Sequence, residues 1–234
     1  MNINNNLKKY LTKIRELKRE KHHALLHEVH KKHHISKKTL FYIKEYGGKS
    51  NVAQTIIRES AKILLLSSIL SSFGGLALEG VQTLFLSIFP LVILLPALND
   101  MIGSYGAIVS SRFSTMLYDG EAKTGFWKNK ALKKLFSQIM ILTFIGAILS
   151  SALALGITHF FSPHFSISIA IRVFLIVIID LFLLTNILFV IAIYAGRYFY
   201  KKQEDPNNFL IPITTSVADF TNMAILSILI LILF

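Results

Sequence analysis

The sequence predicts an all-α, polytopic integral membrane protein with five transmembrane helices and a basic helical arm at its N-terminus. Two observations support this class. Hydrophobic residues make up 53% of the 234 positions, with a mean hydropathy of +0.56, and the net charge is nevertheless +12. High hydropathy with an excess of Lys and Arg is typical of membrane proteins that have basic cytoplasmic segments. Cysteine is absent, which excludes disulfides, thiolate metal sites and cysteine catalysis.

Residues 1–50 are predicted to form a cytoplasmic arm that precedes a membrane domain of residues 51–234. The arm contains 11 Lys and 2 Arg against 4 Glu, a net charge of +9. Apolar residues at helical spacing from Leu7 to Leu17 predict an amphipathic helix, and a second short helix is expected from Ser36 to the Gly47-Gly48 pair. No apolar stretch in the arm has the character of a signal peptide. The basic surface of the arm is suited to bind anionic lipid headgroups, and nucleic acid is not an expected partner.

The arm also carries six histidines between His22 and His34. Four of them fall on one face of a predicted helix: His23, His27, His30 and His34. That spacing could hold a transition metal, but the lysines interspersed in the same stretch oppose cation binding. A solvated or headgroup-facing surface is therefore the favoured interpretation.

Five apolar segments are long enough to span a bilayer, whose hydrocarbon core of about 30 Å requires about 20 helical residues. The predicted spans are residues 57–78, 81–118, 135–160, 169–199 and 209–234. The second is too long for one straight span. It contains two prolines and two glycines, Pro90, Pro96, Gly103 and Gly106. A kinked or locally broken helix is therefore expected there.

The charges of the loops predict the orientation. Basic residues gather in the arm and in the loops at 119–134 and 197–208, whereas the loops around Glu79 and at 159–167 contain no Lys or Arg. The positive-inside rule then places the N-terminus in the cytoplasm and the C-terminus outside. The sequence thus predicts a multi-pass protein of the cell membrane.

The last predicted helix carries a carboxylate, Asp219, well inside its apolar length. An aspartate near the middle of a spanning helix costs about 2.5–3.5 kcal/mol on insertion scales, so it normally faces water, a cation or a partner. Thr215, Asp219 and Asn222 are spaced i, i+4 and i+7, which predicts one polar stripe on a single helical face. The stripe indicates a pathway for a hard cation.

Asp219 also has a structural interpretation, in which it is hydrogen-bonded to a neighbouring helix or ion-paired with Arg112 or Arg172. A further carboxylate, Asp180, lies in the fourth segment, eight residues after Arg172. For Asp180 a secondary ion site and a structural role are both open.

The second predicted helix contains a run of candidate ion ligands. Asn99 and Asp100 follow Pro96 closely, and Gly103 and Ser104 come one turn later. A proline removes a backbone donor and frees the carbonyl one turn earlier. Freed carbonyl, amide and carboxylate oxygens would therefore cluster at membrane depth. The alternative is that the small residues of this helix serve only as a packing face.

The chemistry of the candidate ligands narrows the choice of transported ion. Every candidate ligand in the membrane segments is an oxygen atom, and none belongs to Cys or His, which favours hard cations such as Mg²⁺, Ca²⁺ or Mn²⁺. Mg²⁺ keeps several waters and is bound by one or two carboxylates, so sparse oxygens suit it best. Mg²⁺ is therefore the expected transported ion, and no organic cofactor is expected.

Enzyme signatures are absent from the sequence: there is no P-loop, G-x-S-x-G, H-E-x-x-H or dinucleotide-binding motif. The predicted function is a transporter or channel that moves a divalent cation across the cytoplasmic membrane, with passive flux and Na⁺- or H⁺-coupled exchange both open. The alternative is a membrane-anchored protein whose basic arm binds anionic lipid or nucleic acid without transport.

Two groups of motifs resemble a known family. The first is Pro96-Ala97-Leu98, Gly103 and Ser111-Arg112-Phe113-Ser114-Thr115; the second is Asp205-Pro206-Asn207-Asn208, Ile211-Pro212, Thr214-Thr215 and Asp219. They look like the second-helix and fifth-helix signatures of the MgtE-like, solute carrier family 41 magnesium transporters. The resemblance covers about residues 55–234.

The resemblance implies a five-helix transport domain that works as a pair, so a single copy implies a homodimer with a cation path at its interface. It also implies that Asp219 is the fifth-helix acid that binds hydrated Mg²⁺, while Pro96, Asn99, Asp100 and Gly103 line the path. The sequence departs from the bacterial pattern, in which paired glycines followed by Asn stand in the second helix. It also has a short basic arm in place of large acidic sensor domains.

Overall fold

A computed structural model describes residues 5–16, 22–36, 39–40, 43, 52–122, 129–161, 166–202 and 204–234. These residues form helices, turns and short connections, and none of them forms a strand. The helices with given bounds are α1 (Asn5–Glu16), α2 (His22–His33), α4 (Val52–Glu79), α5 (Gln82–Ser87), α6 (Phe89–Asp119), α7 (Lys130–Phe161), α8 (Ile167–Lys201) and α9 (Pro206–Leu233). Five of them, α4 and α6 to α9, are long and apolar enough to cross a membrane. The prediction of an all-α protein with five spans is confirmed.

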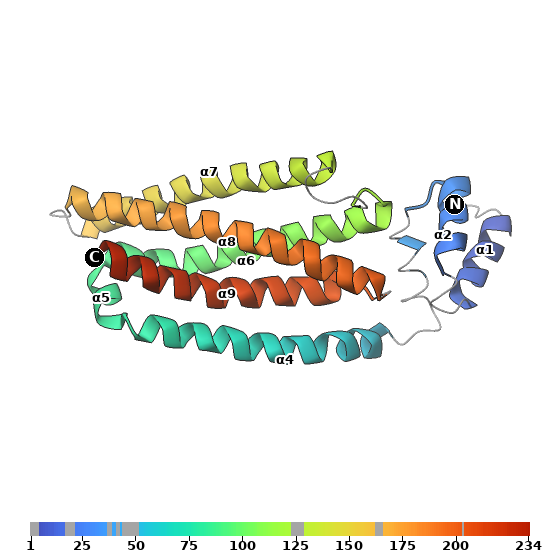
Figure 1. The fold of residues 1–234 in the computed structure, drawn as a ribbon, viewed down its shortest axis with the longest axis horizontal. Helices are drawn as coiled ribbons and strands as arrows, with labels where there is room; N and C mark the ends of the chain where they lie inside the picture. Colours follow the sequence, from blue (N-terminus) through green and yellow to red (C-terminus); the bar gives the residue numbers. More distant parts are fainter. Residues whose placement is uncertain are drawn as a thin grey trace.

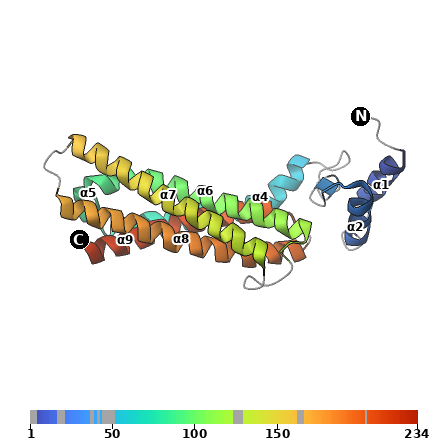
Figure 2. The ribbon, with the colours of Figure 1, turned by 90° about the horizontal axis from the view of Figure 1, so that it is seen from above.

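The five long helices run along the long axis of the molecule, and short α5 lies at the turn between α4 and α6 (Figure 1). Helix α9 packs against three neighbours, α4, α6 and α8, while α7 packs against α6 and α8. Figure 2 shows the same bundle from above. Among the described elements, α9 is the only extensive neighbour of α4, so α9 joins α4 to the rest of the bundle.

The second predicted span is interrupted, as expected, but not inside the proline- and glycine-rich stretch. The interruption lies between α5 and α6, at Ile88, whose backbone is not helical (φ −103°, ψ 78°). Pro90 then lies in the first turn of α6, where a missing N–H leaves no helical bond unmade. Helix α6 continues through Pro96 to Asp119. Its long, unbroken course places Asn99 against α9 and leaves Asp100 exposed on the outer face of α6.

The centre of the bundle is apolar and is formed by α6, α8 and α9 together. Leu98, Leu181 and Leu226 are fully buried there, one from each of these helices. Hydroxyl groups bridge the helices within this packing: Ser110 and Thr214 lie 3.1 Å apart between α6 and α9. Helix α4 differs, since its Leu65 and Leu66 are 66% and 62% exposed. In a bilayer these side chains face lipid or another protein.

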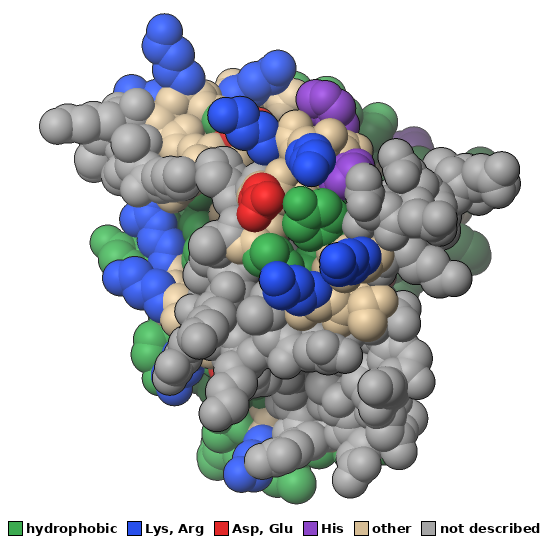
Figure 3. All heavy atoms as spheres, turned by 90° about the vertical axis from the view of Figure 1, so that its right-hand side faces the viewer, with side chains coloured by type: hydrophobic (Ala, Val, Ile, Leu, Met, Phe, Trp, Pro, Cys, Tyr) green, Lys and Arg blue, Asp and Glu red, His purple; other side chains and the backbone are tan. Residues whose placement is uncertain are grey.

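The described part of the arm has a small core of its own, in which Ile14, Val29 and Leu40 are buried. The first predicted helix is confirmed as α1. The predicted second helix is described only in part: residues 39, 40 and 43 are helical, and the Leu40 N–H donates to the Ser36 carbonyl at 3.0 Å. Its expected end at Gly47-Gly48 lies outside the described residues. Figure 3 views the molecule from this end, where Lys and Arg side chains outnumber acidic ones among the described residues.

The predicted face of four histidines is not continuous. Helix α2 ends at His33, and His34 adopts a left-handed backbone conformation (φ 52°) beyond it. His30 forms a 2.6 Å hydrogen bond from its ring Nδ1 to the Ile35 carbonyl oxygen. Because His34 has left the helix, the i, i+4 spacing no longer places it in line with the other three.

Candidate cation pathway

Asp219 lies in the middle of α9 and is half-buried. The Ser71 hydroxyl of α4 donates a hydrogen bond to its Oδ2 at 3.1 Å. Its other oxygen, Oδ1, has no hydrogen-bond partner among the residues that the structure describes. One carboxylate oxygen is therefore positioned by α4, and the other is open to a ligand.

The backbone of α4 approaches α9 closely beside this carboxylate because of a glycine. A Cβ added at Gly74 would lie 3.1 Å from the Phe220 Cα and 3.3 Å from the Asp219 carbonyl oxygen. Small residues permit such close helix contacts in membranes. Ser67 extends the contact by donating to the Pro212 carbonyl at 3.2 Å.

The ion-pair interpretation of Asp219 fails. Arg172 donates instead to the Leu233 carbonyl at 2.8 Å and lies over the ring of Phe234, at the far end of the bundle. Arg112 lines a separate cavity between α6 and α7. The hydrogen-bonded interpretation is partly correct, since Ser71 is a partner from a neighbouring helix.

Asn99 and Asn222 join α6 to α9. The Asn222 amide Nδ2 donates a hydrogen bond to the Asn99 Oδ1. Asn222 is fully buried, and its own Oδ1 has no hydrogen-bond partner among the described residues. An unsatisfied amide oxygen in an apolar bundle costs about 1–3 kcal/mol, so this atom is a ready acceptor for water or for a hydrated ion.

Thr215 lies opposite Gly103, since a Cβ at Gly103 would be 4.0 Å from the Thr215 Cγ2. The Thr215 hydroxyl donates within its own helix, to the carbonyls of Ile211 (2.9 Å) and Pro212 (3.1 Å). The predicted polar stripe is therefore divided in its contacts. Asp219 reaches α4, whereas Thr215 and Asn222 reach α6.

One face of α6 is left uncovered in the single chain. Pro96, Asp100 and Ser104 are exposed and lie four residues apart on this face. Asp100 is the twelfth residue of α6, roughly 17 Å from the start of the helix at 1.5 Å per residue. With the helix centred across a hydrocarbon core of about 30 Å, Asp100 lies roughly 9 Å inside the core boundary, where an exposed carboxylate is strongly disfavoured in lipid. This face of α6 therefore requires water or another protein.

The structure does not bring Asp180 into this group. Its side chain is fully buried in α8, among the apolar residues of the central cluster, and neither carboxylate oxygen has a hydrogen-bond partner among the described residues. The expected proximity of Arg172 gives no ion pair, because that guanidinium bonds to Leu233.

The sequence reasoning missed Ser71 and Gly74, the two residues of α4 that contact α9 beside Asp219. A signal was available, because α4 contains the pairs Ser67-Ser68, Ser71-Ser72 and Gly74-Gly75 in an otherwise apolar stretch. Small and hydroxyl residues repeated at this spacing are typical of a close helix contact in a membrane.

The site has sparse ligands in one chain. No group of three or more His, Cys, Asp or Glu side chains is placed to bind a metal ion within the described ranges. The available ligands are single carboxylates, amides and a hydroxyl, spread over α4, α6 and α9. Such an arrangement can attract a hydrated divalent cation but cannot enclose a dehydrated one.

Comparison with known families supports this chemistry. The family model of MgtE, described as a divalent cation transporter, matches residues 95–229, more than half of the chain. The matched range extends from α6 to α9 and contains Asn99, Asp100 and Asp219, whereas α4 lies before it. Searches of curated proteins and of solved structures returned no significant match. The chain belongs to the MgtE family of divalent cation transporters, which are membrane transporters and not enzymes.

Proposed function

We propose that two copies of this chain form a pathway for hydrated Mg²⁺, lined by α6 and α9 of each copy, with Asp219 as the main electrostatic site. The observation that carries the proposal is the uncovered face of α6, which presents Asp100 within the depth of the hydrocarbon core. A second copy packed over this face would remove the carboxylate from lipid and enclose a polar space between the two chains.

The charges of such a pair favour a divalent ion. Two carboxylates about 8 Å apart repel each other by roughly 2 kcal/mol at an effective dielectric constant of 20. A doubly charged cation between two copies of Asp219 would reverse that repulsion. In each copy, Ser71 donates a hydrogen bond to only one oxygen of the Asp219 carboxylate. Each copy would therefore contribute the other carboxylate oxygen to the ion.

The neutral ligands favour a cation that keeps its water. Thr215 is only partly buried and offers the lone pairs of its hydroxyl, whereas Asn222 is fully buried and would offer its unpaired amide oxygen only where α6 and α9 separate beside it. These groups accept hydrogen bonds from the waters of a hydrated ion as readily as they bind the ion itself. Since Mg²⁺ dehydrates reluctantly and Ca²⁺ prefers six to eight direct oxygen ligands, this set suits Mg²⁺.

Transport is tested by Mg²⁺ entry into proteoliposomes that contain a Mg²⁺-sensitive dye. We expect Asp219→Ala to lower the initial rate by at least about tenfold, the effect of losing roughly 1.4 kcal/mol of ion stabilisation. Glu28→Gln, which removes an exposed acid of α2 in the arm, is the matched control and should retain the normal rate. Equal rates in wild type and Asp219→Ala would refute the assigned site, and no entry in the wild type would refute transport.

The pairing of two copies is tested by cross-linking, which the cysteine-free sequence makes unambiguous. A cysteine at Ser104 on the uncovered face of α6 should form a cross-linked dimer with a short thiol reagent in membranes. A cysteine at Leu153, which is 67% exposed on α7, is the control and should not. Cross-linking of Leu153→Cys but not of Ser104→Cys would place the contact on another face.

A further inference from the structure

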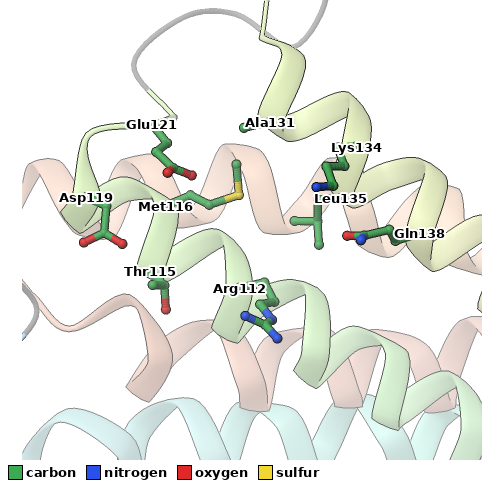
Figure 4. Close-up of a pocket in the computed structure, with 9 residues that line it drawn as sticks. All are labelled: Arg112, Thr115, Met116, Asp119, Glu121, Ala131, Lys134, Leu135 and Gln138. Atoms are coloured by element: carbon green, nitrogen blue, oxygen red, sulfur yellow. The ribbon is translucent and has the colours of Figure 1, made fainter.

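The bundle contains a second polar site, away from Asp219. A cavity of about 410 Å³ lies between the end of α6 and the start of α7, within the usual size range of small-molecule sites. Four charged side chains line it: Arg112, Asp119, Glu121 and Lys134. In Figure 4, Glu121 and Lys134 reach from opposite sides toward the space between the two helices.

The charges of the four side chains around this cavity sum to zero, but these side chains do not form ion pairs with each other. None of these side chains forms an ion pair or hydrogen bond with any residue in the described part of the chain. Arg172 at the other end of the bundle is different, because it has a backbone carbonyl and a ring as partners. The cavity therefore presents two cations and two anions, all exposed and without a partner among the described residues, to a ligand.

The basic Arg112 lies deeper in the membrane than the two acidic residues of the cavity. Helix α6 has 31 residues and is roughly 46 Å long, so about 8 Å would extend beyond a 30 Å hydrocarbon core at each end if it were centred. Arg112 lies seven residues before the last residue, Asp119, and so roughly 10 Å deeper. Arg112 is therefore near the hydrocarbon boundary, where lipid phosphates lie. Asp119 and Glu121 lie beyond it, toward water.

We propose that this cavity binds the phosphoethanolamine headgroup of a membrane lipid, with its phosphate at Arg112 and Lys134 and its ammonium at Asp119 and Glu121. The ammonium group of phosphoethanolamine is joined to its phosphate by two carbons, so a single headgroup carries one anion for Arg112 and Lys134 and one cation for Asp119 and Glu121. Below the cavity, Ile108, Ile141 and Leu142 are exposed on the same two helices, where the acyl chains would pack.

Other ligands fit the charges less well. A free divalent cation would meet Arg112 and Lys134, and an inorganic phosphate would meet Asp119 and Glu121. Phosphatidylglycerol has no cation for the two acids. Phosphatidylcholine has a quaternary ammonium group that cannot donate hydrogen bonds, whereas the primary ammonium of phosphoethanolamine donates up to three.

Native mass spectrometry of the delipidated protein in detergent tests the proposal, with phosphatidylethanolamine, phosphatidylcholine and phosphatidylglycerol of identical acyl chains as the probes. We expect the wild type to bind phosphatidylethanolamine about tenfold more tightly than either of the others, the factor that one charge-assisted hydrogen bond contributes. Equal binding of the three lipids, or a preference for phosphatidylglycerol, would overturn the assignment.

Two pairs of substitutions separate the two halves of the headgroup. Asp119→Asn with Glu121→Gln should abolish the preference for ethanolamine while binding of phosphatidylglycerol persists. Arg112→Gln with Lys134→Gln should weaken binding of all three lipids. Lys133→Gln changes an exposed neighbour that does not line the cavity, so it should leave binding unchanged and serves as the control.

An unchanged lipid preference in the acid pair would contradict the proposal. If a double variant does not yield folded protein, the single variants Asp119→Asn and Arg112→Lys carry the same comparison, with a smaller loss expected. The readout is lipid binding and not Mg²⁺ flux. Failure here therefore leaves the proposed transport function unaffected, and loss of transport in Asp219→Ala leaves this proposal unaffected.

Discussion

Asp219 and Asp180 are both carboxylates inside spanning helices, but their surroundings are opposite. Asp219 is half-buried, has a hydroxyl partner in Ser71 and retains one free oxygen. Asp180 is fully buried among apolar side chains and has no partner among the described residues. Among the described residues, only the first of these carboxylates is partly exposed to a ligand. Under the proposed function, access, more than charge alone, would distinguish a pathway acid from an acid that is merely buried.

The largest effect is expected from moving α4 away from Asp219. Gly74→Leu would place a side chain against the α9 backbone, because even a Cβ there lies 3.0 Å from the Met223 sulfur and 3.1 Å from the Phe220 Cα. Overpacking of this kind costs about 1–3 kcal/mol. We expect Mg²⁺ entry to fall by about tenfold and the thermal midpoint to drop.

The adjacent glycine provides the control for that prediction. A Cβ at Gly75 would meet nothing within 4 Å, so Gly75→Leu should leave both flux and thermal midpoint close to wild type. Similar losses in both variants would mean that glycine flexibility, and not the close approach of α4, is what the site requires.

A smaller effect is expected from removing the hydroxyl partner alone. Ser71→Ala deletes one hydrogen bond to the Asp219 carboxylate, worth about 1 kcal/mol. The initial rate of ion entry at low Mg²⁺ should therefore fall by about fivefold. Ser72→Ala is the matched control, because its hydroxyl donates to the Ser68 carbonyl of its own helix at 2.8 Å. Concentration dependence of the initial rate distinguishes weaker ion binding from a slower maximal rate.

The smallest effect on transport is expected at Asp180. Asp180 is buried without a partner among the described residues. Replacing it by leucine, whose side chain is larger but has the same branched shape, should leave Mg²⁺ entry within about twofold of wild type. It should also stabilise the protein by about 1–3 kcal/mol, since an unsatisfied buried polar group is removed. Thermal unfolding in detergent measures the second effect. A loss of transport in Asp180→Leu would place Asp180 on the pathway and remove the contrast with Asp219.

The sequence predicted the spans because apolar length is a local property, and it singled out Asp219 as a candidate because a carboxylate is conspicuous in such a segment. It could not predict that Asp219 and Asn222 contact different helices. Thr215, Asp219 and Asn222 cover roughly 60° of the α9 surface at 100° per residue. That arc is wide enough for α4 to contact one edge and α6 the other, which depends on how distant helices pack.

Two further features were missed for physical reasons. The interruption at Ile88 lies one residue before the α6 N-terminus. Isoleucine does not itself break helices, whereas the nearby Pro90 and Pro96 are typical helix breakers and yet lie within α6. Ser71 was missed because a serine in a spanning helix commonly bonds to its own backbone, as Ser68 and Ser72 do. Only the packing of α4 against α9 shows that Ser71 faces outward from its helix.

The attachment of α4 through α9 alone has a consequence for local unfolding. An element with a single extensive neighbour opens at a lower free energy than one packed on several sides, and such elements exchange their amide hydrogens as separate units. Helix α4 can therefore detach while α6, α8 and α9 remain folded. Each such opening would take Ser71 away from Asp219, so the proposed ion site would keep its hydrogen bond from α4 only while α4 and α9 stay packed together.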